Sequence, residues 1–450
     1  MMSKNCWIAK LSNWFRAPSP AKVVFAALAT VASMSLAESR GLAQDAPVPF
    51  PDLEKVQTVP FSGVDVETGP AGSQPIGLAQ ILKGEPSDPQ IWASVDYLLW
   101  FTDSTPIPSM LTTGPGNVVG PSGLPGVLGQ PGTQVLIGDS IGFTPASGVR
   151  INAGMWLDRE HLFGVEGAYL LLPNRINNHT WTSSGAPGSM PLSIPYYNTQ
   201  AGAQDTTGVA LPGGFGGTAN LTAQTSFQSA EVNILHRLGE CNGFRFDGMI
   251  GYRWAELNEV LQYDTPSNLR ALGNPREFFN PYDRFHSTSN LYAGQAGLRA
   301  NKEWGRLGLT AWTKIGMGGM AQATKINGAL YTNDYTGYTA IQAYPGGYYA
   351  QPTNSGYHSG TAFSVLPEIG LNGSIRLLEC LKLNIGYTFL YMTNVVRPGD
   401  QISNGINPTQ SPSFTGNPNS KLVGAPAPLY SSQSSDWWAH GLNFGLEFMW

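Results

Sequence analysis

Ten stretches of the chain alternate between apolar and polar residues with a period of two, which is typical of β-strands with one buried face. In the first stretch, Val95, Tyr97 and Leu99 share one face, while Ser94 and Asp96 lie on the other. Each stretch is at least as long as a strand that crosses a bilayer at a tilt. We predict strands at about 91–101, 148–158, 162–172, 226–238, 243–256, 288–301, 306–318, 362–377, 381–392 and 437–450.

Short and long connections alternate along this series of strands. The short ones are Leu157 to Leu162, Leu238 to Gly243, Asn301 to Arg306 and Leu377 to Leu381, and the long ones are 102–147, 173–225, 257–287, 319–361 and 393–436. Strands that run up and down a membrane, with short periplasmic turns and long extracellular loops, have this rhythm. We therefore predict an all-β, antiparallel up-and-down transmembrane β-barrel of about ten strands. Gln134 to Ile137 or Ile326 to Tyr331 would raise the number to twelve, or else form β-structure above the membrane.

The last stretch is the most specific feature of the sequence. Its alternating apolar positions include Phe444, Leu446 and Phe448, and the chain ends on Trp450. A final strand with a terminal aromatic residue resembles the signal that the outer-membrane assembly machinery recognises, and a free strand edge suits recognition by strand addition. We expect this strand to close the barrel against the strand that begins at Ile91, with outer-membrane lipid around it.

Aromatic residues gather near the ends of the predicted strands, where amphipathic rings suit the two membrane interfaces. Any one of these aromatic residues could instead pack in the core of a soluble β-sandwich. The residues are Trp92, Trp100, Trp156, Trp254, Trp304, Tyr391, Trp437, Trp438 and Trp450.

The sequence before the barrel divides into two parts. Residues 1–43 combine basic residues, an apolar run from Val23 to Ala37 and small-residue cleavage positions, as in a secretory signal peptide. Residues 44–90 are Pro-rich and without periodicity, which indicates an extended periplasmic arm; a plug for the barrel is the alternative. The barrel occupies residues 91–450. Removing the signal takes away five bases and one acid, so the net charge falls from −5 to −9, and no basic stripe for nucleic acid is present.

Charged residues fall on the inward face of the predicted strands. An Arg or Lys facing lipid costs about 2 to 4 kcal/mol at the membrane midplane, so charges belong in the lumen. By parity we expect the following to face it: Asp96, Arg150, Glu166, Glu231, Arg245, Asp247, Arg253, Lys314, Glu368, Arg376, Lys382 and Glu447. Opposite charges either pair and close the interior or line a narrow wet passage, and ten strands enclose just more space than side chains fill.

Candidate chemistry is sparse. The six histidines are scattered, with none at metal-ligand spacing, and no Gly-x-Ser-x-Gly elbow is present, so we predict no enzyme activity, no catalytic or metal site and no cofactor. Cys241 and Cys380 would remain after export, in an oxidising compartment. The predicted hairpins separate them, which favours free thiols over a disulfide.

Several segments resemble a known family. They are Ala93-Ser-Val-Asp-Tyr-Leu-Leu-Trp100, Trp156-Leu-Asp158, Phe163-Gly-Val-Glu-Gly167, Gly386-Tyr-Thr-Phe-Leu-Tyr391 and Val396-Arg-Pro-Gly-Asp-Gln401. From about Trp92 to the C-terminus the chain is similar to the planctomycete outer-membrane family of beta-barrel porin 7 proteins. The resemblance implies a barrel in the bacterial outer membrane, with no site residues to carry over.

We predict from these features a narrow passive porin, and a closed barrel is the alternative. The charged lumen favours a narrow passive porin for small solutes, with the arm and the C-terminus in the periplasm. Long connections rich in Gly, Pro, Asn and Tyr favour instead a closed structural or surface-interaction barrel that acts through its extracellular loops.

Overall fold

The computed structural model describes residues 90–268, 278–333, 341–417 and 419–450. The predicted signal peptide lies outside these residues, as does the predicted arm except for Gln90. Among the described residues, no helix is both long and apolar enough to cross a membrane.

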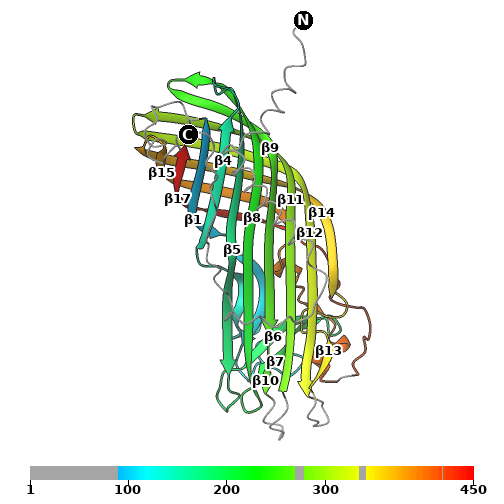
Figure 1. Cartoon of the computed structure of the whole chain (residues 1–450). Coiled ribbons are helices and arrows are strands. Elements are labelled where there is room, and N and C mark those ends of the chain that lie inside the picture. Colours follow the sequence, from blue (N-terminus) through cyan, green and yellow to red (C-terminus); the bar gives the residue numbers. More distant parts are fainter. Residues whose placement is uncertain (1–89, 269–277, 334–340, 418) are drawn as a thin grey trace, which may run out of the picture.

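Ten antiparallel strands form a closed barrel, which confirms the predicted fold (Figure 1). They are β1 (Ile91–Thr102), β4 (Ala146–Trp156), β5 (Phe163–Ser183), β8 (Gly216–Cys241), β9 (Phe244–Asp264), β11 (Phe278–Trp304), β12 (Leu307–Asn333), β14 (Gly356–Leu378), β15 (Leu381–Val395) and β17 (Ser435–Met449). The first and last strands pair in the register that sets Ala93 opposite Phe448, and this pairing closes the ring.

The four short connections lie together at one end of the barrel, which we call the turn end; it is at the top in Figure 1. The β8–β9 turn consists of Asn242 and Gly243, with φ angles of 52° and 74°. Positive φ at both positions is what a tight two-residue hairpin turn requires, and Asn-Gly is its preferred sequence. Local sequence therefore fixes the register of this hairpin.

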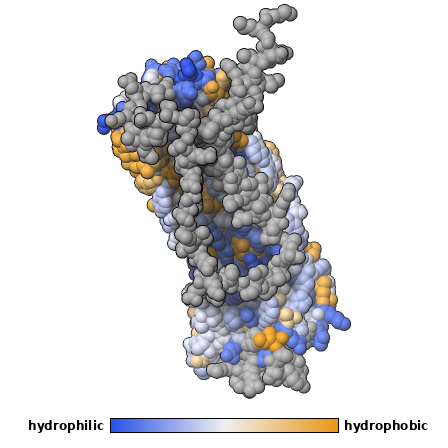
Figure 2. Space-filling view, viewed as in Figure 1, coloured by the Kyte–Doolittle hydropathy of each residue, from blue (hydrophilic) through white to orange (hydrophobic). Residues whose placement is uncertain are grey.

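Exposed hydrophobic side chains form an apolar band on the half of the barrel nearer the turn end. Figure 2 shows part of this band in orange on one face. The outward side chains of Ile250 and Phe363 are 71% and 62% exposed, although both are hydrophobic. Farther along the strands the outer face becomes polar, and Gln228 of β8 donates a hydrogen bond to Glu256 of β9 at 3.0 Å. This change marks where the lipid-compatible surface ends.

Strands β5, β8, β9, β11 and β12 continue well beyond the apolar band and are longer than the pattern predicts. For example, β9 ends at Asp264 and β12 at Asn333, where strands ending near 256 and 318 were predicted. The apolar alternation reports only the lipid-facing part of a strand, whereas backbone pairing continues where both faces are polar or covered by protein. We call the part beyond the band the lobe.

A second sheet packs inside the lobe. Its strands are β2 (Thr105–Thr113), β3 (Gln134–Ile141), β6 (Leu192–Asn198), β7 (Ala203–Ala210) and β16 (Gly405–Ile406). Apolar residues of this sheet, such as Met110 and Ile194, form one core with the inward residues Leu261 and Phe285 of the wall. Two short strands complete the lobe, β10 (Ser267–Asn268) on β8 and β11, and β13 (Ile341–Pro345) on β12.

This arrangement decides the strand number. Gln134 to Ile137 belongs to β3 of the second sheet, and Ile326 to Tyr331 lies within β12, so neither adds a wall strand. Both are β-structure beyond the apolar band, as in the alternative that the sequence left open. Cys241 and Cys380 are not bridged.

Candidate functional site: the barrel lumen

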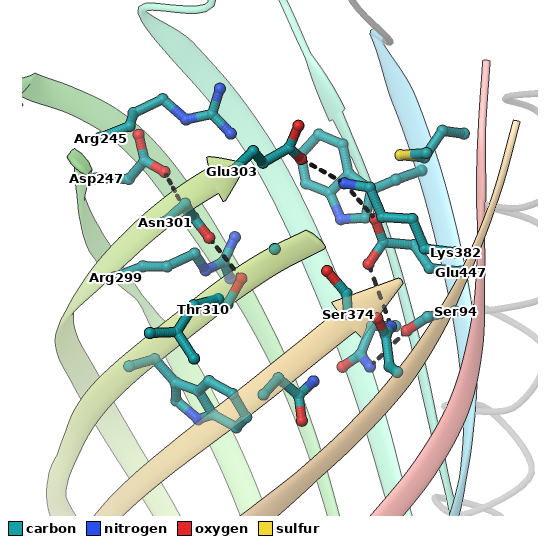
Figure 3. A pocket seen from close by; sticks show the side chains of 18 of the residues that line it. Ser94, Arg245, Asp247, Arg299, Asn301, Glu303, Thr310, Ser374, Lys382 and Glu447 are labelled. Carbon is teal, nitrogen blue, oxygen red and sulfur yellow. Dashed lines mark hydrogen bonds and ion pairs between the residues drawn. The ribbon is translucent and has the colours of Figure 1, made fainter. Parts of the chain in front are cut away.

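The lumen contains a cavity of about 450 Å³ at the turn end (Figure 3). Ten of the twelve charged residues expected in the lumen line it, namely Asp96, Arg150, Glu166, Glu231, Arg245, Asp247, Lys314, Arg376, Lys382 and Glu447. The other two, Arg253 and Glu368, are buried and contact members of this set. All twelve positions therefore lie on or directly beneath one surface.

Ion pairs cross the lumen at the inner limit of the cavity. We call Arg150, Glu231, Arg253, Lys314 and Glu368 the central charge cluster. Glu368 of β14 lies 2.7 Å from Arg253 of β9 and 3.6 Å from both Arg150 of β4 and Lys314 of β12. Glu231 of β8 lies 2.5 Å from Lys314 and 3.5 Å from Arg253. Because the five side chains come from five wall strands, the cluster ties the ring together from within.

Beyond the central charge cluster lies a layer of fully buried apolar side chains, the inner apolar layer. Phe227 of β8 and Trp437 of β17 stack with ring centroids 4.7 Å apart. Trp100 of β1 donates a hydrogen bond to Asn443 at 2.8 Å. The remaining members are Leu98, Ala146, Leu170, Leu172, Ala255, Leu257, Leu291, Ala293, Met320, Leu366, Leu390, Met392, Val395 and Ala439. Side chains from facing strands meet here, so the layer fills the lumen.

These positions correct the interpretation of four tryptophans. Trp92, Trp100, Trp156 and Trp437 were predicted to lie at the membrane interfaces, and all four point inward instead. On each strand these tryptophans alternate with the exposed residues and therefore face the lumen. The prediction relied on their position near a strand end and did not use this alternation. A ten-stranded ring has space for such large rings inside.

A second buried charge group, the Arg397 anchor, lies on the lobe side of the apolar layer. Arg397 and Glu259 are each only 1% exposed at the side chain, and their closest atoms are 2.8 Å apart. Arg397 also lies 2.8 Å from Asp103, at the β1–β2 junction. The anchor therefore fastens the chain after β15 to β9 and to the end of β1, inside the barrel.

The Pro-Gly-Asp-Gln sequence after Arg397 packs against β2 inside the barrel. Its residues form a short 3₁₀ turn, η2 (Gly399–Gln401). A Cβ added to Gly399 would lie 1.7 Å from the carbonyl oxygen of Pro106, so only glycine fits against that strand. The Gln401 amide donates to the carbonyls of Arg397 and Gln433. These contacts hold the segment in the lumen, where a surface loop had been expected.

Four important lumen residues were missed from the sequence. Arg299 lies 2.5 Å from Glu166, and parity alone would have identified it. Glu303, which pairs with Arg376 and Lys382, and Glu259 lie just past predicted strand ends. Arg397 lies in a predicted loop, where no periodic signal exists.

A loop inside the lobe is held by the buried carboxylate of Asp283 on β11. This carboxylate accepts hydrogen bonds from the backbone N–H groups of Tyr348, Tyr349 and Ala350, at 2.7 to 3.1 Å. Burial raises the pKa of Asp283 to about 6, and the three N–H donors limit that rise.

This pKa predicts a pH-dependent lobe. An unfolded Asp has a pKa near 3.9, so between about pH 4 and 6 the native state holds a proton that the unfolded state has lost. Raising the pH from 4 to 7 should therefore lower the free energy of unfolding through this group by about 2 kcal/mol. The measurement is the pH dependence of unfolding in the wild type and in Asp283→Asn, which should lack this component. Equal pH dependence in both proteins would contradict it.

Among the described residues, no group of three His, Cys, Asp or Glu side chains is placed to hold a metal ion. The lumen offers ion pairs, an apolar layer and a cavity of mixed charge.

The chain resembles several solved structures at low similarity. The outer membrane protease OmpT of Escherichia coli is 10% identical, with a TM-score of 0.38 over 81% of this chain and 97% of that one. A FadL homologue from Pseudomonas aeruginosa is 9% identical, with a TM-score of 0.20 over 82% and 93%. The toluene transporter TodX of P. putida is 8% identical, with a TM-score of 0.21 over 82% and 91%. These scores are too low to carry an argument about function.

No curated protein sequence matches the chain. A family model does match, over residues 92–450, which is the whole barrel and most of the chain. The closed barrel wall and its apolar band are consistent with this match. The chain therefore belongs to the outer-membrane β-barrel family described as putative beta barrel porin-7.

Proposed function

We propose that this protein is a closed structural or surface-interaction barrel of the outer membrane, which acts through its lobe. The observation that carries the proposal is the stacking of Phe227 on Trp437 within the inner apolar layer, between the central charge cluster and the Arg397 anchor. A solute would have to displace all three levels to cross. Hydrophobic constrictions also resist wetting, which opposes ion passage.

We further propose that the turn end, with the arm and the C-terminus, faces the periplasm and the lobe faces outward. Short turns on the periplasmic side are usual for these barrels. The outward side chains Phe444, Leu446, Phe448 and the terminal Trp450 are 40–46% exposed, which suits recognition of β17 by the assembly machinery. Antibody binding to an epitope inserted after Pro187 in intact cells would support this orientation, and binding only after lysis would reject it.

The narrow passive porin is the second candidate. It is favoured by the cavity, whose polar lining reaches from the turns to the central charge cluster. For conduction, the segment around Arg397 and the apolar layer would have to move aside.

Planar-bilayer recording of the refolded full chain separates the two functions. We expect no single-channel steps above the lipid background at moderate voltage, because the lumen is filled at three levels. A heat-modifiable band on gels would establish that the sample is folded. Steady, reproducible conductance steps from folded protein would reject the closed barrel in favour of the porin.

A further inference from the structure

Three tryptophans on the cavity wall each lie against a glycine of the neighbouring strand. The directly opposed pairs are Trp92 with Gly154, Trp156 with Gly164, and Trp312 with Gly370. A Cβ at these glycines would lie within 2.2, 2.9 and 2.1 Å of carbons in the six-membered rings. Each glycine therefore lets an indole ring settle onto the barrel wall, and all three rings line the cavity.

The polar groups around these rings are balanced in charge. The described residues that line the cavity include seven Arg or Lys and seven Asp or Glu, so they carry no net charge. An anion or a cation would thus find no overall electrostatic attraction. A purely apolar ligand would have to desolvate these charges without pairing with them, which is unfavourable.

Several buried atoms of the cavity lining have no hydrogen-bond partner in the structure. They include the donors Arg245 Nε and Arg376 Nε and the acceptors Asp96 Oδ1 and Asn372 Oδ1. The Arg245 side chain is labelled in Figure 3, and no dashed line reaches it. The two acceptor oxygens face the wall, because a Cβ at Gly445 or Gly386 would lie 1.9 or 1.6 Å from them. The groups open to an occupant are the partly exposed donors and acceptors of the lining, such as Arg376 and Glu303.

We propose that the cavity binds a small neutral saccharide of about one to three sugar units. Hydroxyl groups donate and accept equally, which matches a cavity lining that holds both donor and acceptor side chains. The C–H faces of sugar rings pack on the electron-rich faces of aromatic rings, which Trp92 and Trp312 supply, whereas the Trp156 ring already stacks on His161. A volume of about 450 Å³ lies within the usual range for small-molecule sites. This inference goes beyond the closed-barrel function and holds whether or not the lumen conducts.

Isothermal titration calorimetry on the refolded full chain tests the proposal. The probes are cellotriose, maltotriose and the trimer of N-acetylglucosamine, with triglycine as a zwitterion and inorganic phosphate as an anion. We expect saturable binding of at least one trisaccharide, and no binding of triglycine or phosphate. Failure of all three saccharides to bind, or binding of triglycine or phosphate in their place, would overturn the proposal.

Variants locate the binding. Trp92→Ala should weaken trisaccharide affinity at least about tenfold, as the loss of one aromatic contact implies, whereas Trp92→Phe should retain most of it. Arg245→Gln should also weaken binding, and it carries the test if Trp92→Ala does not fold. Trp181→Ala is the matched control, because Trp181 lies on β5 fifteen residues beyond the cavity residue Glu166. Unchanged affinity in folded Trp92→Ala or Arg245→Gln would place the binding elsewhere and overturn the assignment.

Discussion

Replacing Glu368 with alanine is expected to lower the free energy of unfolding by about 3 to 5 kcal/mol. Glu368 is the acceptor on which Arg150, Arg253 and Lys314 converge, and its side chain is 2% exposed. Its removal leaves Arg253 and Lys314 to share Glu231 and takes away the ion pair of Arg150. Unfolding in urea, followed by the loss of the heat-modifiable band, gives the measurement.

A Glu-to-Ala change elsewhere in the lumen provides the control. Glu447 lies at the turn end, 27% exposed, and its ion pair with Lys382 is 3.7 Å long. Because water screens this pair, Glu447→Ala should change the stability by less than about 1 kcal/mol. Glu368→Gln, which keeps the shape and part of the hydrogen bonding, should fall between the two. Equal stability of the two alanine variants would show that the central charge cluster does not hold the ring together.

The second large effect is expected at the Arg397 anchor. Arg397→Ala leaves Glu259 buried without its cation, and removal of one partner from a buried pair typically costs about 3 to 5 kcal/mol. Glu259→Ala should be comparably destabilising. The double variant should cost clearly less than the sum of the single variants, because no unpaired charge remains.

A double-mutant cycle in urea measures this coupling between Arg397 and Glu259. The control is Arg284→Ala, which removes an exposed arginine from the outer face of β11 and should shift stability by less than about 0.5 kcal/mol. Additive effects at Arg397 and Glu259 would mean that the two residues act separately. Bilayer conductance should stay absent in Arg397→Ala, because the inner apolar layer still fills the lumen.

The ring of ten strands was predictable because lipid imposes a simple rule on each of them. Outward positions such as Ile250 and Ile385 must be apolar, and inward positions such as Arg253 are free to carry charge. The turns added a second signal, as at Asn242 and Gly243. Both signals lie within short stretches of sequence, so they can be recognised without the tertiary structure.

The interior of the lobe was not predictable in the same way. The segment around Arg397 looks like a loop, because its burial depends on partners such as Glu259 and Asp103 that lie far away in the sequence. The parts of β9 and β12 that lie in the lobe were not predicted for a related reason. Water covers one face and the second sheet covers the other, so no apolar stripe faces lipid there. Strand ends and loop positions follow from tertiary contacts here.

The lengths of the wall strands have a consequence for the order of assembly. The long strands β8, β9, β11 and β12 pair with near neighbours along the chain, so the lobe wall consists mainly of contacts of low sequence separation. Ring closure, in contrast, sets Trp92 opposite Met449, and the β1–β17 seam does not extend into the lobe. The large loss of chain entropy in joining the two ends of the barrel is therefore confined to the part that lipid surrounds.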